Sequence, residues 1–136
     1  MFDTRETERL KIWKDFRDNL EVSANPFLDV ALLWSRAPFV SKYLDPFNPK
    51  SWPDPWKLIL DNRFDDLAIA LGMLYTIQLT KRFKDDRFEI HMAMSEKEKQ
   101  YVLVVNNSVV LNWNPRAVTS TTEMPVETIK IWTAGE

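Results

Sequence analysis

The 136-residue chain has no cysteine, which excludes disulfides, thiolate metal sites and a thiol nucleophile. Glycine is nearly as scarce, at two residues, so turns must be built from Asn, Asp and Pro. The longest apolar run, residues 67–75, is far shorter than the ~20 residues of a membrane helix. The N-terminus lacks the basic-then-apolar pattern of a secretion signal. We therefore expect a cytoplasmic protein with no membrane contact, located in a host cytoplasm or a virion if it is viral.

An excess of positive charge is also missing. The 18 Lys and Arg residues are outnumbered by 20 Asp and Glu, which gives a net charge of −2. Nucleic-acid surfaces normally show a basic excess, so no nucleic-acid partner is expected. One histidine, without HExxH or EF-hand spacing, indicates no metal site, and no cofactor is predicted. The length and the 45% apolar content suit a single domain, residues 1–136, with its own core.

The N-terminal part of the chain has helical periodicity. Four apolar residues recur at intervals of three to four and predict a helix over about 4–21: Leu10, Trp13, Phe16 and Leu20. Asn25 and Pro26 have the properties of an N-cap and a first helical turn. They predict a second helix, which Pro38 breaks or kinks.

The next segment is predicted to be mostly loop. Residues 39–44 are expected to add a further helical turn or two. Three prolines within 45–53 indicate a rigid loop, and Phe47 and Trp52 give that loop apolar surface to pack. An Asp-Pro pair then predicts a short helix over 54–61.

A strongly apolar helix is predicted between an acidic pair, Asp65 and Asp66, and a basic pair, Lys81 and Arg82. Carboxylates favour the start of a helix and cations favour its end. Apolar side chains cover all sides of this helix, which indicates burial on several sides. Gly72 costs the helix about 1 kcal/mol relative to alanine, so we expect a close contact there.

After residue 83 the apolar period changes to two, which predicts an antiparallel sheet of about four strands. The expected strands are residues 87–94, 101–105, 109–113 and 126–132, joined by a loop at 95–99 and a turn at 106–107. The predicted fold class is therefore α+β, with N-terminal helices (1–83) packed on a C-terminal antiparallel sheet (84–136).

Asp65 and His91 are the candidate catalytic residues. A histidine on a strand beside a buried helix can act as a general base. However, His91 lies on the face opposite its apolar neighbours, and a surface position explains it equally. Asp65 and Asp66 can form a catalytic carboxylate pair, yet helix electrostatics alone selects carboxylates at this place.

Trp52 and Trp56 are the candidate interaction residues, because both lie in a proline-rich stretch. Tryptophans in such positions line recognition surfaces, and they also pack ordinary loops. Aromatic residues make up 12% of a chain with little net charge, and this excess favours an interface. We predict a protein partner or self-association into an oligomer.

The order of elements resembles the transglutaminase-like, or papain-like, cysteine proteinases of bacteria. These families place a cysteine at the start of a buried helix, a histidine on a following strand and an Asp or Asn on the next. The resemblance covers roughly residues 60–113, through DDLAIALGMLYTIQL, FEIHMAM and YVLVV. It implies Asp65 near the cysteine position, His91 as the histidine and Asn106 or Asn107 as the third member. Because Asp65 is no thiolate, it implies a degenerate, noncatalytic member.

A second resemblance covers most of the chain. The segments TERLKIWKDFRDNLEVSANPF, WPDPWKLILDN and LGMLYTIQLTKRF are similar to uncharacterised proteins of tailed bacteriophages of marine cyanobacteria. That family implies no known activity. The sequence thus predicts a noncatalytic interaction or assembly protein of phage origin. The alternative is a transglutaminase-like or papain-like hydrolase that uses Asp65 and His91.

Overall fold

The structure is a computed structural model that describes residues 1–96, 98–124 and 127–134. Its helices are α1 (Glu6–Leu20), α2 (Pro26–Trp34), α3 (Pro55–Asp61) and α4 (Asp66–Gln78), with 3₁₀ turns η1 (Pro49–Ser51), η2 (Lys81–Phe83) and η3 (Thr121–Glu123). Its strands are β1 (Phe88–Ser95), β2 (Glu98–Val105), β3 (Val109–Leu111), β4 (Thr119–Ser120) and β5 (Glu127–Thr133). The predicted α+β class, with helices before an antiparallel sheet, is confirmed.

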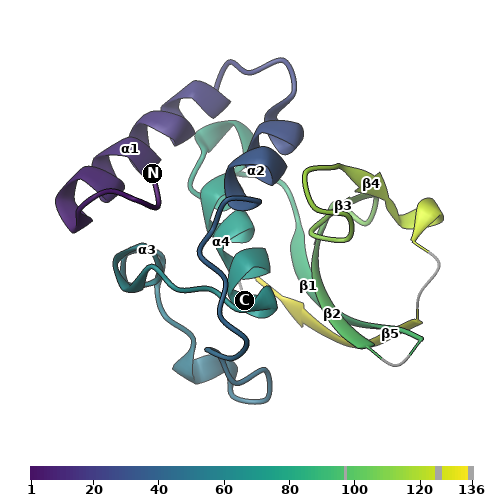
Figure 1. The fold of residues 1–136 in the computed structure, drawn as a ribbon. Helices are drawn as coiled ribbons and strands as arrows, with labels where there is room; N and C mark the ends of the chain where they lie inside the picture. Colours follow the sequence, from purple (N-terminus) through teal and green to yellow (C-terminus); the bar gives the residue numbers. More distant parts are fainter. Residues whose placement is uncertain (97, 125–126, 135–136) are drawn as a thin grey trace.

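Helix α4 forms the centre of the core, between the other helices and the sheet (Figure 1). Nine of its 13 residues are buried, which confirms the predicted burial on several sides. Full burial of a leucine- or isoleucine-sized side chain stabilises the fold by roughly 1.5–3 kcal/mol. The helix therefore determines where both the sheet and the N-terminal helices pack.

The sheet has the strand order β4-β3-β2-β1-β5, and every described strand pair is antiparallel. Its inner face packs in the main core with α4 through Phe88, Ile90, Leu103, Val105 and Leu111. Its outer face carries a second, small cluster of Val102, Val104 and Val110, on which Trp113 and Met124 pack. Residues on the two faces therefore belong to different environments.

Residues 39–44 are extended, so the predicted helical turns there are wrong. Phe39 forms a parallel bridge with Phe64. The Val40 N–H donates to the Phe64 carbonyl at 2.9 Å, and the Phe64 N–H donates to the Pro38 carbonyl at 3.1 Å. Distant partners satisfy this backbone, and a local sequence pattern cannot reveal them.

The described sheet also has one strand more than predicted. β4 contains only two residues, too few to show an alternating pattern, and its Thr119 pairs with Val110 of β3. The β1–β2 connection is tighter than the predicted loop over 95–99, because β1 continues to Ser95 and β2 begins at Glu98. The polar start of β2, with Glu98 and Lys99, hides the period of two.

One threonine hydroxyl joins three helices in the core. The indole N–H groups of Trp13 in α1 and Trp34 in α2 each donate to Thr76 Oγ1 of α4 at 3.0 Å. The hydroxyl in turn donates to the Gly72 carbonyl at 2.7 Å. The three side chains are fully buried, and an unpaired buried donor costs about 1–3 kcal/mol. These bonds therefore fix the Trp34 ring against α4.

Gly72 lies directly against the Trp34 ring, and a Cβ at this position would overlap three ring atoms. Alanine would add about 1 kcal/mol of helix propensity, whereas overpacking a fixed core costs typically ~1–3 kcal/mol and occasionally more. Because the overlap is severe and Trp34 cannot move freely, we predict that the cost of overpacking exceeds the gain in helix propensity. Gly72→Ala should lower the free energy of unfolding by at least about 1 kcal/mol in urea titrations.

A double-mutant cycle separates this clash from a general effect on the helix. Trp34→Leu removes the ring atoms that a new Cβ would meet, so Gly72→Ala should cost less in that background. Equal costs in both backgrounds would show that the Trp34 contact is not the reason for glycine.

Candidate functional site

Helix α4 begins at a carboxylate that serves two segments at once. Asp65 is the N-cap, and its Oδ1 accepts a hydrogen bond from the Ala68 N–H at 2.9 Å. Its Oδ2 accepts from the N–H groups of Tyr43 and Leu44, each at 2.8 Å. The buried carboxylate therefore caps the helix and also holds the extended segment 39–44 against it.

Asp66, the first residue of α4, joins the helix to the sheet. Its Oδ2 accepts from the Tyr101 N–H at 2.7 Å, and its Oδ1 accepts from Asn112 Nδ2 at 3.0 Å. The Asn112 amide also donates to the Tyr101 carbonyl at 2.9 Å. All three residues are half-buried. We call Asp66, Tyr101 and Asn112 the Asp66 site.

The Asp66 site completes an interrupted strand pair. β3 pairs with β2 only at residues 103–105, and Asn112 then turns the chain with a positive φ of 68°. At Tyr101, the Asp66 carboxylate accepts the N–H that a longer β3 would bind, and the Asn112 amide supplies the donor to the carbonyl. Side chains thus satisfy backbone groups that would otherwise be left without a strand partner.

The ionisable groups of the site hold their protons more tightly than usual. Burial raises the pKa of the Asp66 carboxyl; hydrogen bonds from Tyr101 and Asn112 oppose this rise, and the Asp65 charge adds to it. Burial, and then the nearby carboxylates, also raise the pKa of the Tyr101 phenol above its ordinary 10.0. The phenol is therefore protonated at neutral pH and cannot act as a base.

Two clefts meet at Asp66, and Phe39 lines both of them. The first cleft has a volume of about 270 Å³, and its lining includes Lys42 and Lys99. The second has a volume of about 260 Å³, and its lining includes Arg116. Each is slightly smaller than the roughly 300–1,000 Å³ of typical small-molecule sites. Phe39 is 64% exposed between them, so a large apolar side chain is open to a partner.

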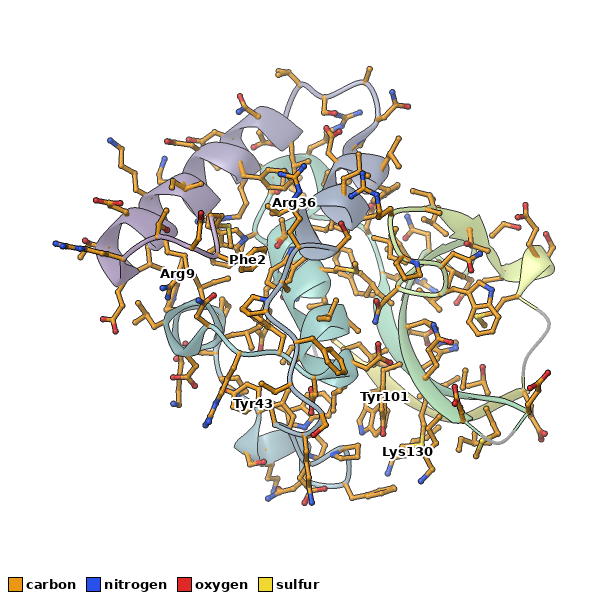
Figure 2. All side chains as sticks on the ribbon, in the orientation of Figure 1. Phe2, Arg9, Arg36, Tyr43, Tyr101 and Lys130 are labelled. Atoms are coloured by element: carbon orange, nitrogen blue, oxygen red, sulfur yellow. The ribbon has the colours of Figure 1, made fainter. Side chains whose placement is uncertain are left out.

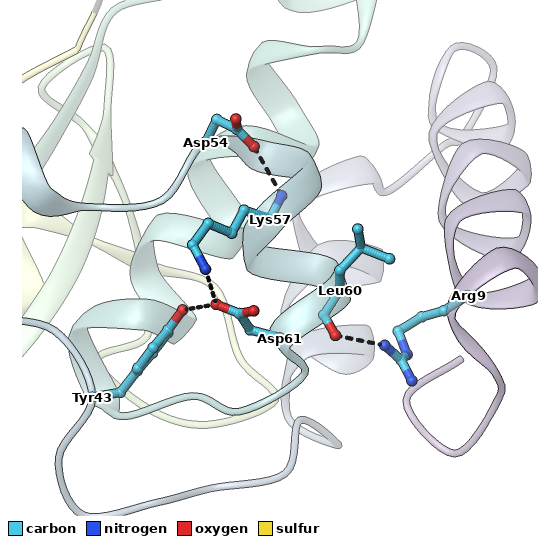
Figure 3. A network of polar contacts seen from close by, with 6 residues as sticks. All are labelled: Arg9, Tyr43, Asp54, Lys57, Leu60 and Asp61. Carbon is cyan, nitrogen blue, oxygen red and sulfur yellow. Dashed lines mark hydrogen bonds and ion pairs between the residues drawn. The ribbon is translucent and has the colours of Figure 1, made fainter.

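A second polar network anchors the segment that forms one wall of the first cleft (Figure 3). The Tyr43 hydroxyl donates to Asp61 Oδ2 at 2.5 Å, and Lys57 Nζ binds the same oxygen at 3.1 Å. Burial, and then the hydrogen bond to Asp61, raise the pKa of the Tyr43 phenol. Tyr43 is therefore held both by its backbone and by its side chain.

His91 lies outside the Asp66 site. It pairs with Val102, a member of the outer-face cluster, so it faces away from α4. Its ring nitrogens contact the Glu89 carboxylate at 3.1 Å and the Thr128 hydroxyl at 3.3 Å. The structure does not bring His91 and Asp65 together, because the sheet separates them.

Asn112 is the asparagine that reaches the start of α4, and the sequence analysis missed it. The predicted candidate, Asn106, lies in the β2–β3 turn with φ 52°, and it binds both backbone polar groups of Arg87. Its N–H donates to the Arg87 carbonyl at 2.9 Å, and its Oδ1 accepts from the Arg87 N–H at 2.8 Å. The one signal for Asn112 is its place directly after the apolar strand VVL, which also fits an ordinary turn residue.

The two candidate tryptophans take part in intramolecular packing. Trp52 lies edge-on to Trp132, with ring centroids 5.5 Å apart, and its indole N–H donates to the Asp45 carbonyl at 2.8 Å. Trp56 packs on Trp13 at 5.8 Å but stays 48% exposed. Their part in an interface stays a prediction.

The carboxylates at the start of α4 are poorly suited to a metal ion. Asp65 and Asp66 together accept five N–H hydrogen bonds, so donors already face their oxygens. Within residues 1–96, 98–124 and 127–134, no three His, Asp or Glu side chains are grouped to hold a metal. None of the helices described is both long enough and apolar enough to cross a membrane.

Solved structures resemble the chain over nearly its full length. LapG of Legionella pneumophila is similar with a TM-score of 0.73 and 14% identity, over 96% of this chain and 77% of LapG. A calcium-bound LapG structure gives a TM-score of 0.72 and 15% identity, over 98% and 84% of the two chains. An EGTA-treated form of LapG gives a TM-score of 0.69 and 14% identity, over 95% of this chain and 77% of LapG. No protein-family profile and no curated sequence matches the chain.

The LapG likeness confirms the transglutaminase-like fold predicted from the order of elements. Sequence identities of 14–15% establish the fold and nothing finer. The predicted resemblance to marine phage proteins finds no support in these comparisons.

Two helix N-caps that accept different numbers of hydrogen bonds, Asp54 and Asp65, provide a matched test. Asp54 caps α3 through a single exposed bond from the Lys57 N–H, whereas Asp65 accepts three bonds. We predict that Asp65→Ala lowers the free energy of unfolding by about 3–5 kcal/mol, because a cap and two further donors lose their partner. Asp54→Ala should cost about 1 kcal/mol. Equal losses in urea unfolding would mean that the bonds to Tyr43 and Leu44 contribute nothing.

The raised pKa of Asp66 predicts the sign of a pH effect. A carboxyl group whose pKa is higher in the folded than in the unfolded state binds its proton more tightly when folded. Stability therefore falls as the pH rises from the unfolded pKa through the folded one. Asn112→Asp places a second carboxylate within hydrogen-bond distance of Asp66, and two such groups resist joint ionisation. We predict a larger loss of unfolding free energy at about pH 7 than at about pH 4.5.

Asn112→Ala is the control for this pH effect. It removes the same hydrogen bonds without adding a charge, so its cost should increase less between about pH 4.5 and pH 7 than the cost of Asn112→Asp. If Asn112→Asp shows no more pH dependence than Asn112→Ala, the carboxylates do not interact as the geometry requires.

Proposed function

We propose that the protein is a noncatalytic interaction protein built on a transglutaminase-like fold. The observation that carries this proposal is the hydrogen bonding of the Asp66 site. Both oxygens of its carboxylate are occupied by donors from the sheet side. A group that holds two elements together in this way serves the fold, and the chain has no thiol to replace it.

The positions that meet at this site support the proposal. In transglutaminase-like cysteine proteinases, a cysteine starts the buried helix, a histidine lies on a following strand, and an Asp or Asn lies on the next. Here the start of α4, strand β2 and the end of β3 meet as Asp66, Tyr101 and Asn112. A carboxylate whose two oxygens already accept hydrogen bonds, a protonated phenol and an amide supply no thiolate and no imidazole to activate one.

The surroundings of the site support binding to a partner. Two clefts remain open on either side of Asp66, with Phe39 exposed between them. A large apolar side chain exposed beside a cleft is typical of an interaction surface. The polar networks around Asp65 and Tyr43 keep the walls of the first cleft in place, so little order must be gained on binding.

A hydrolase that uses Asp65 and His91 is the alternative. The fold agrees with it, since LapG shares this architecture. The side chains give it no support, because Asp65 is bound by three N–H donors and His91 faces the other side of the sheet.

We therefore predict no hydrolytic or acyl-transfer turnover. Purified protein, incubated with panels of peptides, amides and acyl donors, should form product no faster than buffer does. Turnover that is lost in His91→Ala would overturn the proposal and favour the hydrolase.

A further inference from the structure

We propose that the first cleft binds an extended acidic segment of a protein partner, which adds as a short strand beside the free backbone of Lys99 at the start of β2. The proposal rests on the noncatalytic function proposed above and specifies the chemistry of the partner. The surface involved consists of Phe39, Lys42, Phe47, Lys99 and Lys130, and we call it the Lys–Phe surface.

The free edge follows from the register of the sheet. β3 pairs with β2 only at residues 103–105, so the beginning of β2 extends beyond its neighbour. The N–H and C=O of Tyr101 point to the β3 side, where Asp66 and Asn112 bind them. Alternate residues of a strand direct these groups the same way, so Lys99 presents its own pair to that side. Among the residues described, no strand pairs with Lys99 there.

The first cleft borders this edge. Lys99 and Tyr101 line it from β2, and Phe39, Ser41 and Lys42 line it from the extended segment. That segment is fixed by its bonds to Phe64 and Asp65, so the opposite wall is firm. An added strand lies about 4.8 Å from its neighbour. Its backbone hydrogen bonds would supply affinity that does not depend on the identity of its side chains.

The charge of the surface selects an acidic segment. Lys99 Nζ and Lys130 Nζ both lie over the Phe47 ring, at 5.9 and 5.4 Å from its centroid. Neither these lysines nor Lys42 forms an ion pair with any residue in the described part of the chain. Like charges gathered on one ring repel, and carboxylates of a partner would relieve that repulsion.

The acidic residues of the cleft do not cancel this selection. Asp65 and Asp66 both line it, but their oxygens accept five N–H hydrogen bonds from within the fold. The lysines reach further into solvent, since Lys42, Lys99 and Lys130 are all exposed. They therefore determine the charge that an arriving segment meets first.

Two phenylalanines add apolar contacts to the same surface. Phe39 and Phe47 are each 64% exposed. Figure 2 shows Tyr101 and Lys130 close together near the end of the sheet that borders this surface, and both contact the Trp132 ring. Side chains of an extended segment alternate in direction, so acidic residues can face the lysines while apolar residues contact the phenylalanines.

The test uses the intact chain and a short fluorescein-labelled peptide of alternating Glu and Val. Fluorescence anisotropy should show binding at least about tenfold tighter than for a Lys-Val peptide of equal length, a difference of about 1.4 kcal/mol. Affinity should fall as salt is raised, because the lysines are exposed. Equal affinity for both peptides, or no binding of the acidic one, would overturn the proposal.

A matched pair of double variants locates the site. Lys99→Glu with Lys130→Glu should weaken binding about tenfold or more, since attraction becomes repulsion. Lys11→Glu with Lys84→Glu changes the net charge equally at exposed positions on α1 and after η2, and should leave affinity nearly unchanged. Circular dichroism confirms that both variants fold. If both double variants lose affinity equally, net charge alone explains the weaker binding, and the assigned surface is wrong.

A backbone-methylated peptide tests strand addition itself. Methylating alternate N–H groups keeps the carboxylates but removes backbone donors, so binding should be lost. If the methylated peptide binds as well as the parent, the added strand is wrong. If the acidic peptide does not bind and the chain forms a dimer that Lys99→Glu with Lys130→Glu dissociates, the surface belongs to a second copy and the proposal fails. None of these results affects the noncatalytic function, which fails only if the chain cleaves a substrate.

Discussion

The carboxylates of Asp65 and Asp66 connect three parts of the molecule that are distant in sequence. Asp65 binds the start of α4 and the extended segment before η1, and Asp66 binds the edge of the sheet. An unpaired buried N–H costs about 1–3 kcal/mol, so it would be costly to leave these five donors without the two carboxylates. The position of α4, and with it both walls of the first cleft, depends on these bonds.

The bonds of Asp66 are the basis for proposing a noncatalytic function on this fold. The start of a buried helix is a favourable place for an anion, whether that anion is a thiolate or a carboxylate. Asp66 meets the electrostatic requirement of that position, and its oxygens accept hydrogen bonds from the Tyr101 N–H and the Asn112 amide. What remains beside it is an open cleft with exposed lysines and a phenylalanine, which are features of binding.

Features with a local cause could be predicted from the sequence. The apolar helix α4 and its acidic cap each follow from a few neighbouring residues, and Gly72 indicates a close contact without indicating that Trp34 makes it. The partner of Asp66 could not be predicted, because Asn112 lies 46 residues away and reaches it only through the register of β3. Residues 39–44 were mistaken for helix for the same reason: their hydrogen bonds go to Phe64 and Asp65, and no periodicity records that.

Amide hydrogen exchange at Tyr43 and Leu44, measured residue by residue by NMR, tests the central role of Asp65 most directly. These amides belong to no described helix or strand, and they donate their hydrogen bonds to the Asp65 carboxylate. The Phe47 amide is the internal reference, because it bonds only to the exposed side chain of Asp45 nearby. The account predicts that Tyr43 and Leu44 exchange as slowly as the buried amides of α4. Exchange as fast as that of Phe47 would contradict it.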